Sequence, residues 1–187
     1  AIGDGVFGAV NPGGKLTMTF PKSVGQIPLY YAHKNTGRPL KEGKWFEKFR
    51  SNYLDVDNDA LYPFGYGLSY TTFRFSDITL NRSSIGMDNE LVASVTVTNT
   101  GDRAGSEVVQ LYIRDLVGSV TRPVKELKGF EKIYLQPNES RTVRFTIAPE
   151  MLKFYNADLK FVAEPGDFDV MIGPDSRNVK TARFTLR

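Results

Sequence analysis

Apolar residues alternate with polar ones along most of the chain after residue 70, which is the period of a strand with one buried face. Turn-forming residues rich in Asn, Gly, Pro and Asp separate the alternating runs. The inward sets are Leu91, Ala93, Val95 and Val97; Val109, Leu111 and Ile113; Val143, Phe145 and Ile147; Phe168, Val170 and Ile172; and Phe184 with Leu186. A further strand is expected at 125–131 and one helical turn near 149–153. About seven short strands predict an immunoglobulin-like β-sandwich.

The first seventy residues have a different character. Residues 1–40 are dense in Gly and Pro, with one strand candidate from Leu16 to Phe20. A lone strand cannot form a sheet, so this stretch is expected to complete a domain whose other parts lie outside the chain. Residues 41–69 read as an irregular linker with an aromatic run. We therefore predict an incomplete α/β-domain tail (1–40), an aromatic junction (41–69) and a sandwich (70–187). A chain that opens on a Gly-rich turn without Met is also expected to be a fragment.

Composition narrows the function classes. The 187 residues carry a net charge of +3 and no run of like charges, so no basic stripe for nucleic acid is present. No apolar stretch is long enough to span a membrane. The absence of cysteine excludes disulfides and thiol chemistry. No residue pattern calls for a cofactor or a metal ion, and none is expected.

Two motifs match ligand-binding patterns only in part. Gly3, Gly5 and Gly8 have the spacing of a dinucleotide loop, but the preceding strand and following helix are missing. The alternating carboxylates at 55, 57 and 59 suggest a calcium loop, yet the glycine and glutamate of that motif are absent. A structural glycine loop and a solvated acidic loop are the favoured interpretations.

His33 is the chain's one histidine, which is too few for a His-based metal site. A hydrogen-bonded loop histidine is favoured, although its polar loop is a candidate to approach a ligand. Trp45, Tyr53, Tyr62 and Tyr66 could stack on sugar rings, but packing of a domain junction is favoured. Within the sandwich, three tyrosines fall outside the inward pattern and are candidates for an exposed aromatic platform: Tyr112, Tyr134 and Tyr155.

Several long stretches resemble glycoside hydrolase family 3. Residues 61–73 (LYPFGYGLSYTTF) are similar to the motif that leads into that family's C-terminal domain. Residues 7–16 (FGAVNPGGKL) look like the end of its α/β-sandwich domain, and 23–28 (SVGQIP) with 31–39 (YAHKNTGRP) look like the continuation in bacterial periplasmic β-glucosidases. Residues 122–132 (RPVKELKGFEK) are similar to its fibronectin-III-like domain. The resemblance covers essentially the whole chain.

This resemblance implies a mainly β fragment: a fibronectin-III-like sandwich preceded by the tail of an α/β-sandwich domain. It implies a parent β-glucosidase that removes terminal β-D-glucosyl residues with retention, located in the periplasm or secreted. The family's nucleophile and acid/base would lie upstream, so no catalytic residue is assigned and the chain alone is expected to be inactive. Its partners would be the parent's barrel and α/β domain and, through them, a β-glucoside, and a homodimer is compatible with the sequence.

The expected role of the chain is structural. The junction is expected to pack through Tyr62, Phe64, Tyr66 and Tyr70. Candidates to approach the sugar are His33, Asn35, Arg38, Tyr53 and Asp55. The alternative functions are a carbohydrate-binding or a protein-interaction module, which would present exposed aromatics on the sandwich.

Overall fold

The computed structural model describes residues 2–40 and 44–187. Residues 1 and 41–43, which belong to the predicted first domain and linker, lie outside the described residues. Strands hold 38% of the chain and helices 7%, so the predicted mainly β fold is confirmed. In the described residues no helix has the length and apolar character needed to cross a membrane.

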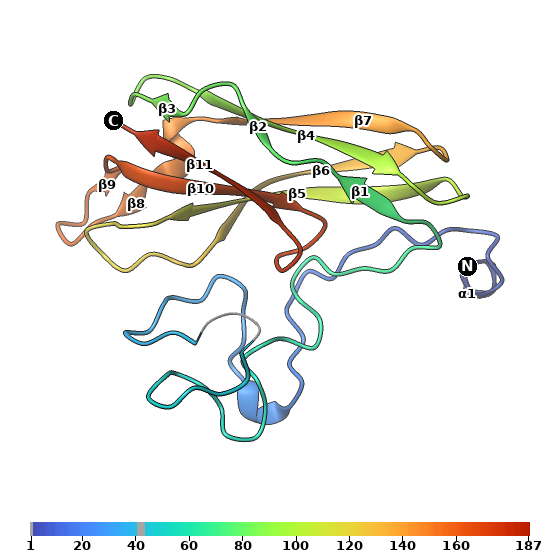
Figure 1. Cartoon of the computed structure of the whole chain (residues 1–187), viewed down its shortest axis with the longest axis horizontal. Helices are drawn as coiled ribbons and strands as arrows, with labels where there is room; N and C mark the ends of the chain where they lie inside the picture. The colour runs from blue at the N-terminus through green and yellow to red at the C-terminus, as the bar shows by residue number, and fades with distance from the viewer. Residues whose placement is uncertain (1, 41–43) are drawn as a thin grey trace.

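Two sheets pack face to face in the C-terminal part (Figure 1). In the first, the long strand β4 (Leu91–Asn99) pairs on one side with β1 (Phe73–Phe75) and β2 (Thr79–Leu80), and on the other with β7 (Ser140–Ile147). The second has the order β3 (Ser84–Ile85), β11 (Lys180–Leu186), β10 (Gly166–Gly173), β5 (Gly105–Asp115) and β6 (Glu126–Leu135). Only the β11–β3 pair among these described strands is parallel.

The core between the sheets consists of the inward apolar sets that the alternation predicts. Leu91, Val97 and Leu111 are fully buried, and the rings of Phe168 and Phe184 stack with their centroids 5.4 Å apart. Burial alternates strictly along β4, because side chains of successive strand residues point to opposite faces. Such burial is the main favourable term in the stability of the sandwich.

The connection from β7 to β10 crosses one end of the sandwich. It contains the short 3-10 helix η2 (Pro149–Leu152), where the sequence predicts a helical turn, and a two-stranded hairpin of β8 (Phe154–Tyr155) and β9 (Phe161–Val162). Asn156 closes this hairpin, because its side-chain oxygen accepts hydrogen bonds from the backbone N–H groups of Asp158 and Lys160.

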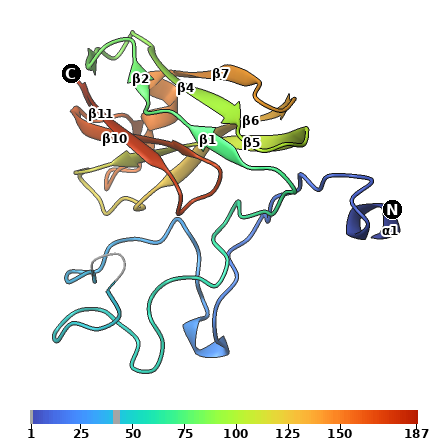
Figure 2. The same cartoon turned by 45° about the vertical axis from the view of Figure 1, so that its right-hand side comes forward.

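The N-terminal segment, defined as residues 2–40 and 44–70, lies below the second sheet as an irregular chain (Figures 1 and 2). It contains only a five-residue helix α1 (Ile2–Val6), which the sequence does not predict, and a 3-10 turn η1 (Val24–Gln26). The strand expected from Leu16 to Phe20 is wrong. Phe20 does exchange backbone hydrogen bonds with Tyr62, and the Leu16 N–H donates to the Tyr66 carbonyl. Between these points Pro63 has no N–H and Gly65 has a positive φ of 81°, so no regular ladder forms.

Candidate functional site

The outer face of β5 is covered by aromatic side chains of the N-terminal segment. Tyr112 points away from the sandwich core, yet none of its surface is exposed. The Tyr31 ring meets it edge-on at 5.6 Å between centroids, and Tyr31 in turn packs on Phe64 at 4.5 Å. We call Tyr31, Phe64 and Tyr112 the aromatic knot. The sequence-based idea that Tyr112 belongs to an exposed platform is wrong, because the N-terminal segment buries this face of the sheet.

Polar contacts complete the knot. The Tyr112 hydroxyl donates to Gln110 Oε1 at 2.6 Å, and Gln110 Nε2 donates to the carbonyls of Gly65 at 3.3 Å and Pro174 at 2.5 Å. Burial raises the pKa of the Tyr112 hydroxyl far above its usual range, so the hydroxyl stays protonated and remains a donor. The buried polar atoms of this group are therefore paired with one another.

The connection between β5 and β6 holds a second part of the segment. The Val124 N–H donates to the His33 carbonyl at 2.9 Å, and the Leu127 N–H donates to the Tyr31 hydroxyl at 3.4 Å. An antiparallel bridge joins Lys34 to Pro123. The loop that carries His33 is thus attached to the residues at the start of β6.

A third attachment closes the acidic loop. Gln26 is fully buried, and its amide makes four hydrogen bonds: it accepts from the N–H groups of Lys22 and Ser23 and donates to the carbonyls of Asp57 and Asp59. The Lys22 ammonium contacts both carboxylate oxygens of Asp57 at 2.7 Å. We call Lys22, Gln26 and Asp57 the loop clasp. In the described residues no group of three potential metal ligands gathers, and Asp57 is taken up by this clasp.

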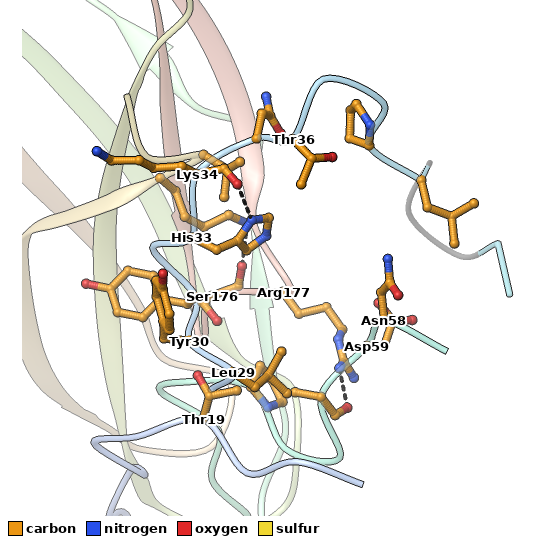
Figure 3. Close-up of a pocket in the computed structure, with 18 of the residues that line it drawn as sticks. Thr19, Leu29, Tyr30, His33, Lys34, Thr36, Asn58, Asp59, Ser176 and Arg177 are labelled. Atoms are coloured by element: carbon orange, nitrogen blue, oxygen red, sulfur yellow. Dashed lines mark hydrogen bonds between the residues drawn. The ribbon is translucent and has the colours of Figure 1, made fainter. Parts of the chain in front are cut away.

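These attachments enclose a cleft of about 910 Å³ between the N-terminal segment and the outer face of β5, β10 and β11, which we call the junction cleft. Figure 3 shows its wall, where the Arg177 guanidinium donates to the Ala60 carbonyl at 2.6 Å. Polar and aromatic side chains predominate among the residues that line it, which include Tyr30, His33, Lys34, Asn35, Asn52, Tyr53, Asn58, Asp59, Arg114, Asp169, Ser176 and Arg177.

Three side-chain oxygens of this lining have no hydrogen-bond partner in the protein: the Thr19 hydroxyl and the amide oxygens of Asn52 and Asn58. The amide nitrogens of both asparagines are used, since they donate to the carbonyls of Tyr53 and Ser51. Buried acceptors of this kind need a donor, which water or a hydroxyl-bearing ligand would supply.

The structure brings together three of the five residues expected to approach a sugar. His33, Asn35 and Tyr53 line the junction cleft, whereas Arg38 and Asp55 do not. His33 Nδ1 lies 3.3 Å from the Lys34 carbonyl, and the Tyr53 hydroxyl donates to the Gln26 carbonyl at 3.0 Å (Figure 3 shows His33). The cleft also contains Asn58, Arg114 and Arg177, which sequence reasoning did not single out because their places follow only from the fold.

The four residues expected at the junction have different environments. Phe64 is half-buried in the aromatic knot, and the rings of Tyr62 and Tyr66 stack at 4.9 Å. Tyr70 is more exposed, and its hydroxyl donates to the Gly5 carbonyl at 2.6 Å. A largely buried ion pair between Lys15 and Glu107 at 2.7 Å adds a further link between the segment and β5.

Comparisons with known proteins place these features in a family. The model of the glycosyl hydrolase family 3 C-terminal domain matches residues 1–70, and that of the fibronectin type III-like domain matches residues 107–176. A periplasmic β-glucosidase of Salmonella typhimurium is 55% identical over 186 residues, which cover 100% of this chain and 24% of the relative.

The chain belongs to glycoside hydrolase family 3. A putative β-xylosidase of Formosa agariphila is 47% identical over 97% of this family 3 chain and 23% of its own length. The crystal structure of a mutant β-glucosidase from Listeria innocua, in complex with laminaribiose, superposes with a TM-score of 0.94 at 43% identity, covering 100% of this chain and 26% of that one. The chain thus spans about a quarter of the length of the relatives it matches and corresponds to their C-terminal portion.

The loop clasp gives a pH-dependent prediction. Hydrogen bonding from Lys22 holds the pKa of the Asp57 carboxyl below its usual value of 3.8. A lowered pKa in the folded state stabilises the fold above the unfolded-state pKa, and this contribution is lost as pH falls through the folded-state pKa. The pair is about one-third exposed, so solvent screening limits its contribution to about 1 kcal/mol or less.

We therefore expect Asp57→Asn to lower the free energy of unfolding slightly at pH 7 and by less near pH 2. Urea unfolding of both proteins at the two pH values measures this. Asp77→Asn is the matched control, because Asp77 pairs with Lys180 while 92% exposed and should have no effect at either pH. An equal loss for Asp57→Asn at both pH values would contradict the interpretation.

Proposed function

We propose that this chain supplies the C-terminal part of a retaining β-glucosidase that removes terminal β-D-glucosyl residues, and that its sandwich braces the parent enzyme. The observation that carries the proposal is the 55% identity to a periplasmic β-glucosidase along the whole chain. The name of that relative also supports a periplasmic or secreted location. Because a similar relative is named a putative β-xylosidase, the sugar must be established by assay.

The bracing role follows from how the N-terminal segment is held. The aromatic knot, the Val124–His33 hydrogen bond and the loop clasp fix an irregular segment that has almost no secondary structure of its own. We infer that 1–40 and 41–69 act as the tail of an α/β domain and a junction, and 70–187 as the sandwich that supports both. A site shared between domains needs such rigid support to keep its reacting groups in place.

The remainder of the parent is the partner that this surface fits. Most of the large apolar side chains that are exposed in the described residues belong to the N-terminal segment, whereas the sandwich exposes few. The most exposed of them are Ile2, Phe7, Val24 and Leu54 in the N-terminal segment. Exposed apolar surface of this extent marks an interface. Since the relatives are about four times longer, we propose that their preceding domains cover it.

The junction cleft is the place where this chain would approach a sugar. Its unpaired acceptor oxygens on Thr19, Asn52 and Asn58 suit the hydroxyl donors of a β-glucoside. We propose that His33, Asn35 and Tyr53, which line the cleft, lie near the bound substrate. Arg38 and Asp55 do not line the cleft and would approach a substrate only from outside it. No catalytic role is assigned to any of them.

The full-length parent and the isolated chain are expected to differ in hydrolytic activity. Retaining hydrolysis needs two carboxyl groups about 5–5.5 Å apart, and the family's pair is expected on upstream domains. We expect the full-length parent to hydrolyse an aryl β-glucoside and the isolated 187-residue chain to give no turnover. Assays of both proteins on aryl β-glucoside and aryl β-xyloside also decide the sugar. Turnover by the isolated chain would contradict the assignment of the catalytic residues to the missing domains.

A binding-module function is favoured by one observation. On the β8–β9 hairpin the rings of Tyr155 and Phe161 lie 5.0 Å apart and both are more than half exposed. Such a pair could stack on a sugar. Calorimetric titration of the chain with glucan oligomers, compared with a Tyr155→Ala/Phe161→Ala variant, tests this function. Equal heats for both proteins would exclude the hairpin as the binding site.

A homodimer is a further proposal. Sedimentation of the full-length parent measures the oligomeric state, and a single monomeric species at all concentrations would exclude it.

A further inference from the structure

Arg122 lies in the connection between β5 and β6 and contacts three elements of the sandwich. Its side chain is 14% exposed, and its guanidinium carbon lies 4.3 Å from the ring centroid of Phe154 on β8. Nη2 donates to Glu126 at the start of β6 at 2.8 Å, and Nε lies 3.9 Å from Asp115 at the end of β5. A planar cation on an aromatic face is a specific and rigid contact.

The rest of this connection folds over Arg122. Gly118 lies so close that a Cβ at this position would stand 3.0 Å from Arg122 Cγ. Ser119 is anchored to Glu164, since its N–H and hydroxyl donate to the two carboxylate oxygens at 2.8 and 2.6 Å. Asp115 Oδ2 and Arg122 Nε are buried and make no hydrogen bond, so their attraction is electrostatic only. Arg122 is therefore the charged centre around which residues 115–126 are arranged.

Residues that follow Arg122 directly hold one wall of the junction cleft. Pro123 forms the bridge with Lys34, Val124 donates to the His33 carbonyl, and Leu127 donates to the Tyr31 hydroxyl. Val124, Tyr31 and His33 all line the cleft. A displacement of residues 123–127 would thus be transmitted to the loop at 30–36 through one backbone hydrogen bond, one β-bridge and one hydrogen bond to a side-chain hydroxyl.

We propose that Arg122 is a positioning residue for substrate binding: by its contacts with Phe154, Glu126 and Asp115 it fixes residues 123–127, and through them the cleft wall at 30–36. Its substrate role rests on the proposed function, because it takes the cleft wall to lie near the β-glucoside. The expected consequence is an effect on KM rather than on kcat, since Arg122 does not line the cleft itself and acts on it only through residues 123–127.

The first test measures amide hydrogen exchange in the full-length parent. In Arg122→Lys the charge remains but the planar contact with Phe154 is lost. We expect the Val124 and Leu127 amides to exchange about tenfold faster, while amides of the β10–β11 pair keep their protection. Lys180→Met, which removes an exposed ion pair on β11, is the control and should leave Val124 and Leu127 unchanged.

A second variant removes the charge of residue 122 altogether and must still fold. Arg122→Met alone would leave Asp115 buried without a counter-charge, so it is combined with Asp115→Asn. In this double variant we expect the same selective loss of protection. Unchanged exchange at Val124 and Leu127 in both variants would overturn the proposal, and so would a uniform increase over the whole sandwich, which marks a merely structural role.

The second test is kinetic. With a β-glucosyl disaccharide we expect Arg122→Lys to raise KM about tenfold, in line with the exchange result, and to leave kcat within about twofold. Lost protection with unchanged KM would overturn the substrate role of Arg122 while the parent's activity, and hence the proposed function, still stands. If the wild-type parent hydrolyses no β-glucoside, the proposed function fails, and the exchange measurement still decides whether Arg122 positions the cleft wall.

Discussion

Tyr112→Ala is expected to lower the free energy of unfolding by about 3–5 kcal/mol, the usual cost of truncating a buried aromatic side chain. Tyr112 is fully buried although it faces away from the sandwich core, so the loss would arise at the junction with Tyr31. The substitution also leaves Gln110 Oε1 without its donor. Urea unfolding of the chain, followed by circular dichroism, gives the change in free energy.

Two control variants separate the contributions at this site. Tyr112→Phe keeps the ring and removes only the hydroxyl, so it should cost about 1–3 kcal/mol, the range for an unsatisfied buried group. Tyr134→Ala truncates a tyrosine that is 54% exposed on the neighbouring strand, and it should change stability by about 0.5 kcal/mol or less. If Tyr112→Ala were no worse than Tyr134→Ala, the aromatic knot would not contribute to stability.

Asn99→Leu is expected to have a comparable effect for a different reason. The Asn99 side chain is fully buried and makes four hydrogen bonds: it accepts from the Thr71 hydroxyl and the Gly101 N–H, and it donates to the carbonyls of Arg103 and Leu135. Leucine has nearly the same shape but no polar atom. The Gly101 N–H and the carbonyls of Arg103 and Leu135, which are buried or partly buried, would then lose these partners, at a cost of roughly 3 kcal/mol or more.

The same unfolding measurement checks this prediction. Asn89 offers a matched control, because it is an exposed asparagine in a turn, and Asn89→Leu should cost about 0.5 kcal/mol or less. A loss below about 1 kcal/mol for Asn99→Leu would show that water or a local rearrangement replaces the four hydrogen bonds.

The sandwich was predictable because its signal is local. The alternation of apolar and polar residues around Leu91, Val95 and Val97 indicates which side of the strand is buried, and the structure places all three in the core. The short strands β1, β2 and β3 were harder to predict, since two or three residues carry too little periodicity to be distinguished from a loop.

The junction depends on contacts between residues far apart in sequence. Nothing near Tyr112 indicates that Tyr31, about eighty positions earlier, covers it, so the inside–outside pattern of β5 alone points to the wrong environment. Likewise the carboxylate of Asp57 resembled part of a metal loop until the fold brought Lys22 to it. Residue spacing predicts which side chains lie together only within one secondary-structure element. A cleft between an irregular segment and a sheet can be located only once the fold is known.

The aromatic knot has a consequence for exchanging parts between enzymes. A domain boundary is normally sought in a linker that few contacts cross, which here would suggest a cut near residue 70. Such a cut would expose the face of β5 that carries Tyr112. It would also remove the Gly65 carbonyl, to which the Gln110 amide donates. The transferable unit therefore includes Tyr31 and Phe64 together with the sandwich, and a chimera should be joined upstream of them.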